Sequence, residues 1–193
     1  MAPRGAVEAG ERVFLRRPRA RDEEEFVALL KKSRPFLRPF EPRPPRGVSA
    51  AGPERFATLL RASRGKRGEK LLIFRRQDGV LLGNVNASEI VRGAFHSCYL
   101  GYWIGAPFAR QGYMTEALGL MLRHAFTTLG LHRVEANIIP TNTPSQRLVK
   151  RLGFRREGLS KDYLKIDGRW QDHARYALLV DEWRARVRGK GGR

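Results

Sequence analysis

The chain has 193 residues, of which 41% are hydrophobic, and its formal net charge is +19 at pH 7. That hydrophobic fraction is enough for a packed core, so a wholly disordered chain is excluded. The single cysteine, Cys98, excludes an internal disulfide and fits a reducing compartment. No apolar run is long enough to cross a membrane, and neither a P-loop pattern nor a zinc-ligand spacing is present.

The charge comes mostly from arginine, which supplies 30 of the 38 basic residues. Residues 1–76 carry a net charge of +11 and residues 147–193 one of +8, whereas residues 77–146 are neutral overall. This distribution predicts attraction of both ends of the chain to a polyanion, such as RNA, DNA, an anionic membrane or a phosphorylated cofactor. A GC-rich genome would give the same excess of arginine without such a partner. The neutral middle is typical of either a reaction centre or a buried segment.

In the first half of the chain, Asp22 is expected to cap a helix over residues 23–33. The five prolines of residues 34–47 predict an ordered loop rather than a regular helix. Three apolar side chains of this loop need burial: Phe36, Leu37 and Phe40. The other elements expected here are a strand at 11–17, a helix at 53–64, a hairpin of strands at 70–76 and 80–90, and a strand at 95–104.

In the second half, apolar residues at helical spacing predict a helix over residues 114–129, which Gly130 would end. The elements expected after it are a strand at 132–139, a helix at 144–152, a hairpin of strands at 154–166 and 169–180, and a disordered tail after Trp183. Together these elements predict an α+β fold, with a mixed, largely antiparallel sheet and helices on both faces.

Two segments carry chemistry. The loop at 105–113 contains Gly105 and Gly112 and leads into a helix whose free amides suit a pyrophosphate, although a glycine here is also typical of a plain turn. Asn142 and Ser145 begin the next helix, where either residue could cap it or contact a ligand. The order of the elements places both helix starts near one end of the sheet.

The motifs resemble those of a known family. The pattern W-I-G-x-x-x-x-x-x-G-Y-M-T-E-A-L at 103–118 resembles the acetyl-CoA-binding motif of the GNAT N-acetyltransferases, and N-T-P-S-Q-R-L-V-K-R-L-G-F at 142–154 resembles their next block. The run K-D-Y-L-x-I-D-G-x-W-x-D-H at 161–173 resembles the RimJ/RimL type of ribosomal-protein-alanine N-acetyltransferase, and RimJ in particular. The usual loop pattern Q/R-x-x-G-x-G/A is altered, because Ala109 and Met114 stand at its ends and Arg110 would supply the charge.

The resemblance implies the GNAT fold over residues 10–183, with a seven-stranded sheet splayed at its centre, an N-terminal tail at 1–9 and a basic C-terminal tail at 184–193. It implies direct transfer from acetyl-CoA, in a ternary complex and without a metal, to the N-terminal α-amine of a ribosomal protein that starts with Ala or Ser. The expected location is the cytoplasm, as a monomer or dimer, without membrane association and with ribosome or rRNA contact through the basic ends. Two alternatives remain open: a GNAT enzyme for a small amine (an aminoglycoside, polyamine or amino acid), and a ribosome-assembly or RNA-binding factor that keeps the fold.

The resemblance also implies site residues. A backbone N–H within residues 103–105 would hold the thioester carbonyl. Ser145 would protonate the departing thiolate or orient a water, and Asn142 would contact the pantetheine arm. The full set expected to bind the cofactor is Trp103, Ile104, Gly105, Arg110, Gln111, Gly112, Tyr113, Met114, Thr115, Asn142 and Ser145.

An α-amine has a pKa of about 7.7–8.0 and needs only a mild base. The candidates left open are Glu135, Asn137 acting through water, Asp162 and Asp172; of these, Glu135 and Asp172 join Ser145 and Asn142 as the predicted catalytic set. The predicted walls of the acceptor pocket are Phe36, Phe40, Tyr163 and Trp170, which would otherwise serve to anchor the loops at 34–47 and 159–172. Cys98 lies outside the motifs, and Glu116 is expected to be a structural partner.

Overall fold

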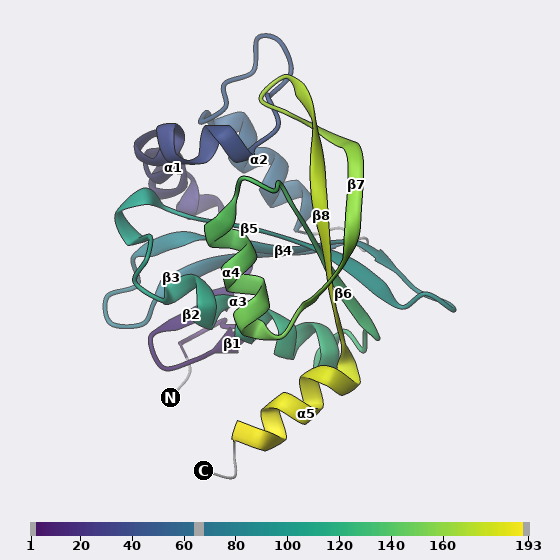
Figure 1. The fold of residues 1–193 in the computed structure, drawn as a ribbon. Helices are drawn as coiled ribbons and strands as arrows, with labels where there is room; N and C mark the ends of the chain where they lie inside the picture. Colours follow the sequence, from purple (N-terminus) through teal and green to yellow (C-terminus); the bar gives the residue numbers. More distant parts are fainter. Residues whose placement is uncertain (1–2, 64–67, 191–193) are drawn as a thin grey trace.

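The strands of the protein form one mixed sheet in the order β1-β2-β3-β4-β5-β6-β8-β7 in the computed structural model, which describes residues 3–63 and 68–190 (Figure 1). The strands are β1 (Glu8–Ala9), β2 (Val13–Arg16), β3 (Gly68–Arg75), β4 (Leu81–Val91), β5 (Ser97–Ile104), β6 (Arg133–Ile138), β7 (Arg155–Ile166) and β8 (Arg169–Leu179). Every neighbouring pair is antiparallel except β5 and β6, which are parallel. Seven strands were predicted, and the eighth is the two-residue β1, which pairs with β2 inside the segment expected to be a tail.

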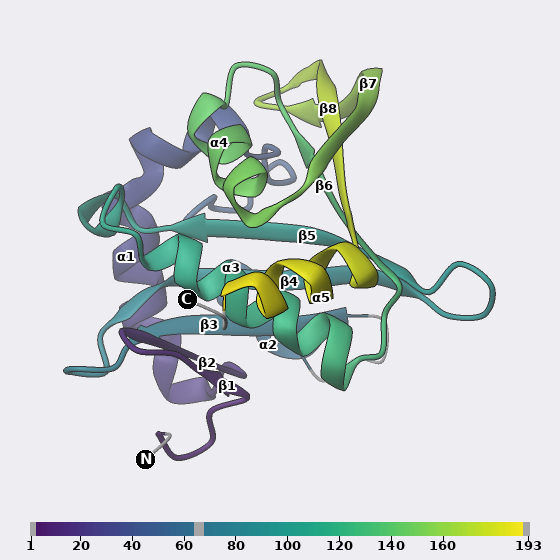
Figure 2. The same cartoon turned by 60° about the horizontal axis from the view of Figure 1, so that its bottom comes forward.

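Helices cover both faces of this sheet, as predicted. They are α1 (Glu23–Leu37), α2 (Pro53–Ala62), α3 (Tyr113–Arg123), α4 (Thr143–Leu152) and α5 (Val180–Lys190). Figure 2 shows α1 and α2 behind the sheet and α3 and α5 in front of it. Alternation along β3 builds two cores, because Leu72 and Phe74 pack with α1 and α2 whereas Leu71 and Ile73 pack with α3.

The sheet is splayed at its centre, between β5 and β6. These strands pair only over three positions, where Ser97, Cys98 and Tyr99 face Arg133, Val134 and Glu135. Beyond them β6, β8 and β7 turn away from the other strands (Figure 1). The predicted splay is therefore present, and it leaves one edge of β5 without a neighbouring strand beyond Tyr99.

The helix predicted over 23–33 is longer than expected. α1 runs through Pro35 to Leu37 and continues as a 3₁₀ turn over Arg38–Phe40, so the exclusion of helix from the start of the proline-rich loop was wrong. Pro35 lies in the last turn, where its missing N–H costs a single helical hydrogen bond, and the extension buries Leu37. Phe36, for which the sequence predicted burial, is 46% exposed.

Asp22 does not cap α1 with its side chain. Its carboxylate accepts a hydrogen bond from the Arg19 N–H at 2.7 Å and pairs with the Arg16 guanidinium at 2.7 Å. The first turn of α1 still contains three glutamates, which suit the positive end of the helix dipole. Asp22 therefore stabilises the segment that leads into the helix and does not bind the first N–H groups of the helix.

The predicted tail after Trp183 is helical as far as Lys190. Trp183 packs on Phe126 with ring centroids 5.4 Å apart, and Glu182 accepts the Leu179 N–H at 2.8 Å. Arg186 donates to the Arg151 carbonyl at 3.0 Å, which ties α5 to α4. These contacts order a sequence whose charge predicted disorder; residues 191–193 lie outside the described chain.

The other predicted elements are confirmed with small shifts of their ends. The predicted helix over 114–129 consists of α3 followed by a π-helical turn at His124–Thr128, and Gly130 ends it with a φ of +63°. Within residues 3–63 and 68–190 there is no helix with the length and apolar character needed to cross a membrane.

Candidate active site

A cavity of about 640 Å³ opens at the splay between β5 and β6. Its walls come from the ends of these two strands, the loop before α3, the start of α4, and the segment that follows α1. Of the residues predicted to bind the cofactor, eight line it: Trp103, Ile104, Arg110, Gly112, Met114, Thr115, Asn142 and Ser145. The two motif segments, which are well separated in the chain, thus meet in one cavity.

The loop before α3 presents amides toward this cavity. Gly112 has a φ of +84° and Arg110 one of +61°, and alternating left-handed residues turn successive N–H groups into one concave surface. The first hydrogen bond of the helix runs from the Glu116 N–H to the Gly112 carbonyl at 3.3 Å, which leaves the amides of Tyr113, Met114 and Thr115 without helical acceptors. This arrangement suits a pyrophosphate.

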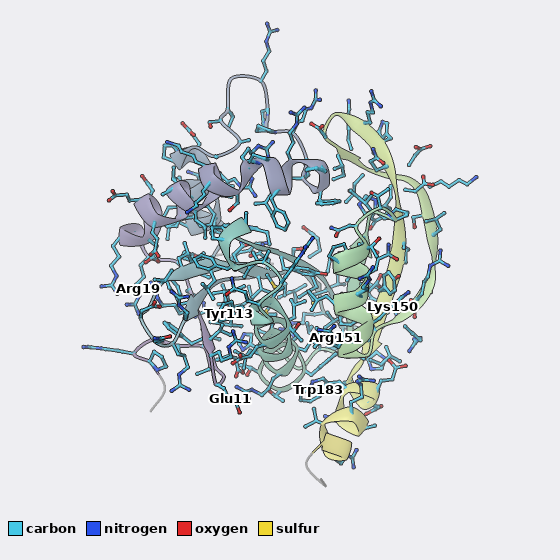
Figure 3. All side chains as sticks on the ribbon, turned by 60° about the vertical axis from the view of Figure 1, so that its left-hand side comes forward. Glu11, Arg19, Tyr113, Lys150, Arg151 and Trp183 are labelled. Carbon is cyan, nitrogen blue, oxygen red and sulfur yellow. The ribbon has the colours of Figure 1, made fainter. Side chains whose placement is uncertain are left out.

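Three arginines line the same cavity: Arg110, Arg147 and Arg151. Arg147 and Arg151 are four residues apart and therefore lie on one face of α4; Arg151 and its neighbour Lys150 project from that helix in Figure 3. Arg110 was predicted to supply the charge missing from the loop pattern. The cavity therefore combines free amides with cations, as a phosphorylated cofactor requires.

The unpaired edge of β5 offers further backbone groups. The Gly105 N–H donates to the Leu82 carbonyl of β4 at 2.7 Å. Because successive amides of an antiparallel strand point to opposite edges, the N–H groups of Ile104 and Tyr102 point toward the splay. Within the predicted span 103–105, the amide available to a ligand is therefore that of Ile104, and Gly105 cannot donate.

Ser145 lies in hydrogen-bond contact with Tyr102. The Ser145 Oγ is 2.5 Å from the Tyr102 hydroxyl, which joins the start of α4 to the end of β5 across the cavity. Burial raises the pKa of Tyr102 to about 12, against a smaller lowering by its contact with Ser145. Asn142 caps α4, because its Oδ1 accepts the Ser145 N–H at 3.2 Å, and this cap positions Ser145.

The two predicted catalytic carboxylates do not reach the cavity. Glu135 is buried on β6 between Arg133 and Arg175, at 2.9 Å and 2.6 Å from their guanidinium nitrogens. Asp172 accepts the backbone N–H of Asp162 at 2.9 Å in the irregular part of the β7–β8 hairpin. Neither carboxylate is among the residues that line the cavity. Local sequence patterns do not reveal Arg175 or Asp162 as partners, since each lies on a different strand from the carboxylate that it contacts.

A second group of polar residues lines the cavity on the β6–β8 side. Asn137 donates from Nδ2 to the Tyr163 hydroxyl at 3.1 Å, and the Tyr163 ring packs on the His173 ring at a centroid distance of 5.4 Å. Asn137 and His173 line the cavity, whereas Tyr163 supports them from behind. Burial raises the pKa of Tyr163, so its hydroxyl stays neutral.

An arch borders the cavity on the side lined by Phe40 and Glu41. We give this name to residues 38–43 together with the β7–β8 turn at Asp167 and Gly168, which meet at the top of Figure 1. The Asp167 carboxylate pairs with Arg43 at 2.8 Å and Arg38 at 3.5 Å, and its N–H donates to the Glu41 carbonyl at 3.1 Å. Direct contacts therefore join the proline-rich loop to the last hairpin beside the cavity.

The predicted wall residues separate into two pairs. Phe36 and Phe40 line the cavity, and Phe40 is itself part of the arch. Tyr163 is in the supporting layer, and Trp170 is 60% exposed on the outer face of the hairpin, away from the cavity lining.

Three residues predicted to bind the cofactor do not line the cavity: Tyr113, Gln111 and Gly105. The Tyr113 ring lies under the Arg12 guanidinium at 4.2 Å, and Arg12 together with Arg75 lowers the pKa of its phenol. The Gln111 side chain donates back to the Pro107 carbonyl at 2.8 Å. Gly105 lacks a side chain because of α1: an added Cβ would lie 2.5 Å from Leu29 Cδ1.

Two further expectations concern residues outside the cavity. Glu116 is confirmed as a structural partner, since its Oε1 accepts the N–H groups of Arg12 at 2.9 Å and Val13 at 3.3 Å. Cys98 is buried away from the cavity, and burial raises the pKa of its thiol to about 12. Such a thiol is a poor nucleophile at neutral pH.

Several cavity residues were not predicted from the sequence to belong to the site, and those with functional side chains include Tyr102, Arg147, Arg151 and His173. Tyr102 directly precedes W-I-G, and the two arginines are spaced i, i+4 behind the Asn142 cap, so both signals were present in the sequence. His173 ends the D-H pair of the last motif. Its place in the cavity depends on the pairing of β8 with β6 and could not be predicted from spacing.

Comparison with known proteins agrees with this geometry. Residues 12–155 match the family model described as acetyltransferase (GNAT) domain. Over 177 residues the chain is 37% identical to the ribosomal protein uS5-alanine N-acetyltransferase of Escherichia coli (strain K12), and the match covers 90% of each protein.

Solved structures give the same result. RimJ of Mycobacterium smegmatis, in complex with CoA-disulfide, superposes with a TM-score of 0.83 at 32% identity, over 93% of this chain and 89% of that one. The ribosomal-protein-S5-alanine acetyltransferase of Vibrio fischeri does so with a TM-score of 0.78 at 26% identity, over 91% and 97%. The chain therefore belongs to the GNAT acetyltransferases and, within them, to the ribosomal-protein N-acetyltransferases of the RimJ/RimL type.

Proposed function

We propose that this chain transfers the acetyl group of acetyl-CoA to the N-terminal α-amine of a ribosomal protein whose first residue is Ala or Ser. The observation that carries the proposal is the 37% identity to the Escherichia coli enzyme, over 90% of each protein. That enzyme is named for the alanine of ribosomal protein uS5. Because ribosomal proteins are made and assembled in the cytoplasm, we expect the enzyme to act there.

The cofactor end of the cavity suits acetyl-CoA, which supplies a thioester already activated for attack by an amine. The amides at the start of α3 and the guanidinium groups of Arg110, Arg147 and Arg151 would hold its phosphates. The Tyr102 amide on the open edge of β5 would pair with an amide group of the pantetheine arm. The Ile104 N–H is the donor we assign to the oxyanion that develops on the thioester carbonyl.

Ser145 is the residue we assign as proton donor to the departing thiolate. Its Oγ faces the Tyr102 hydroxyl, and Tyr102 stays protonated because burial raises its pKa to about 12. Transfer would be direct: Cys98, the one thiol of the chain, is buried and does not line the cavity.

The decisive experiment is an acceptor panel. The protein is incubated with acetyl-CoA and peptides that start with Ala or Ser, each with an internal lysine, and the acetylated position is found by mass spectrometry. Matched peptides with a blocked N-terminus serve as controls, and a polyamine and an aminoglycoside test the alternative. Acetylation of free N-termini alone supports the proposal, whereas transfer only to lysine or to the small amines would overturn it.

A further inference from the structure

His173 lies in the wall of the cavity with one ring nitrogen fixed. Its side chain is 3% exposed, and Nδ1 is 3.0 Å from the Gln171 carbonyl oxygen. A carbonyl only accepts hydrogen bonds, so Nδ1 carries the hydrogen and the neutral ring has its lone pair on Nε2. Among residues 3–63 and 68–190, no hydrogen bond reaches Nε2, and the Tyr163 ring holds the imidazole from one side.

Asn137 leaves an unused acceptor in the same cavity. Its Nδ2 donates to Tyr163, whereas its Oδ1 is buried and receives no hydrogen bond from any described residue. A buried acceptor without a partner costs free energy, so this oxygen is set up for an N–H group that arrives with a ligand. Tyr163 contacts both Asn137 and His173, and it therefore fixes the two cavity groups relative to each other.

The described lining of the cavity contains no carboxylate that is free of an ion pair. Glu41 is the one carboxylate that lines it, and both its oxygens are held by Arg34 and Arg55, at 3.0 Å and 2.5 Å for the shortest contact of each. Glu135 is held by Arg133 and Arg175 outside the lining.

We propose that His173 is the general base of the transfer, whose Nε2 takes a proton from the acceptor α-amine while Asn137 Oδ1 holds that amine by a hydrogen bond. This assignment rests on the acetyl transfer proposed above. It differs from the carboxylates predicted from the sequence, and it gives a role to the histidine that ends the last motif.

The protons and bonds balance without a further reactant. The acceptor enters as an ammonium group and loses one proton to His173 Nε2, which passes it to solvent. The free amine nitrogen forms the C–N bond as the thioester carbonyl becomes an oxyanion. When this tetrahedral intermediate collapses, the C–S bond breaks. Ser145 protonates the thiolate and regains a proton from the same nitrogen, so the third ammonium proton remains on the product amide.

The test compares two variants, each assayed with an amine that the wild-type protein acetylates. His173→Asn keeps a donor at the place of Nδ1 and removes Nε2, whereas His173→Ala opens a space that free imidazole can enter. We expect both to lower kcat by about 10²-fold or more while acetyl-CoA binding, measured by calorimetry, stays unchanged. Added imidazole should restore part of the activity of H173A and none of that of H173N.

Each outcome decides the assignment. Wild-type kcat in H173N overturns it, and so does a loss of acetyl-CoA binding in both variants, since His173 would then only support the fold. Absence of imidazole rescue in an H173A variant that binds acetyl-CoA also counts against it. If the wild-type protein acetylates only small amines, the proposed acceptor is wrong, but the same comparison with that amine still tests His173.

Discussion

At the scale of single residues, the contact between Ser145 and Tyr102 is the one on which departure of the thiolate depends. Ser145→Ala removes the hydroxyl that we assign as proton donor, and kcat is expected to fall by about 10²-fold with little change in the KM for acetyl-CoA. Steady-state kinetics at saturating acceptor measure this. Thr143→Ala, which removes a hydroxyl from the same turn of α4 outside the cavity lining, is the matched control and should behave as wild type. An S145A enzyme with unchanged kcat would contradict the role.

The pH profile tests the partner of Ser145. A tyrosine stays neutral below its pKa, and burial raises that of Tyr102 to about 12, so its hydroxyl keeps its proton throughout the working range. We expect kcat to show no falling limb between about pH 8 and 10, where an ordinary tyrosine of pKa about 10 would already lose half its protons. Tyr102→Phe should cost about tenfold in kcat, as one hydrogen bond of about 1.4 kcal/mol would. A falling limb in the wild type that Y102F abolishes would refute the raised pKa.

The sequence predicts residues that act through the backbone or through a local cap better than residues that act through distant partners. Asn142 and Gly112 lie where the motifs place them, since a cap and a left-handed turn depend on neighbours in the chain. Glu135 was a poor choice because its environment comes from Arg175 on another strand. His173 was missed for the same reason, since its cavity is formed only when β8 pairs with β6.

At the scale of elements, the arch joins the segment after α1 to the β7–β8 turn through the Asp167 carboxylate and one backbone hydrogen bond. The hydrogen bond from Arg43 lowers the pKa of Asp167, so the side chain is charged at neutral pH and its contribution is lost only as pH falls through that lowered pKa. Asp167→Asn keeps the shape and removes both ion pairs. We expect a several-fold higher KM for the acceptor peptide and an unchanged KM for acetyl-CoA, because only the acceptor end loses support.

A matched control separates closure of the cavity from surface charge. Asp78→Asn breaks the exposed pair with Arg75 at the β3–β4 turn, outside the cavity lining, and should leave both KM values unchanged. Equal effects of D167N and D78N on the acceptor KM would mean that the arch has no part in binding.

The elements that the sequence misjudged are those whose local pattern is overruled by packing. Prolines and cations argue against helix at the end of α1 and along α5. Burial of Leu37 in the first case, and the stacking of Trp183 on Phe126 in the second, supply contacts that no local pattern encodes. The strands and hairpins were predicted closely because their alternation and turn residues are local signals.

At the scale of the whole molecule, the motifs predicted the sheet with its central splay. They did not predict which charged groups form ion pairs and which remain free on the surface. Many of the acidic groups are consumed in ion pairs with arginine, such as Glu135 and Glu157 with Arg133. The excess positive charge remains on the surface, for example at the exposed Lys161 and Lys165 of β7, for which no ion pair is found within the described chain. This surface is suited to a polyanion.

We therefore expect the protein to associate with ribosomes through phosphate contacts and to dissociate from them steeply as salt is raised. If about six phosphates are neutralised, affinity should fall by about 10³-fold between about 50 and 200 mM salt, measured by co-sedimentation. Replacing Lys161 and Lys165 with serine should reduce the slope of log affinity against log salt by about one for each phosphate that is no longer neutralised. The S145A variant has the charge of the wild type and should sediment like it, which separates association from catalysis. Contacts between a protein of net charge +19 and rRNA release counterions, so such an association is strongest at low salt. If the protein does not sediment with ribosomes even at low salt, the association is refuted and genomic bias remains as the explanation of the arginine content.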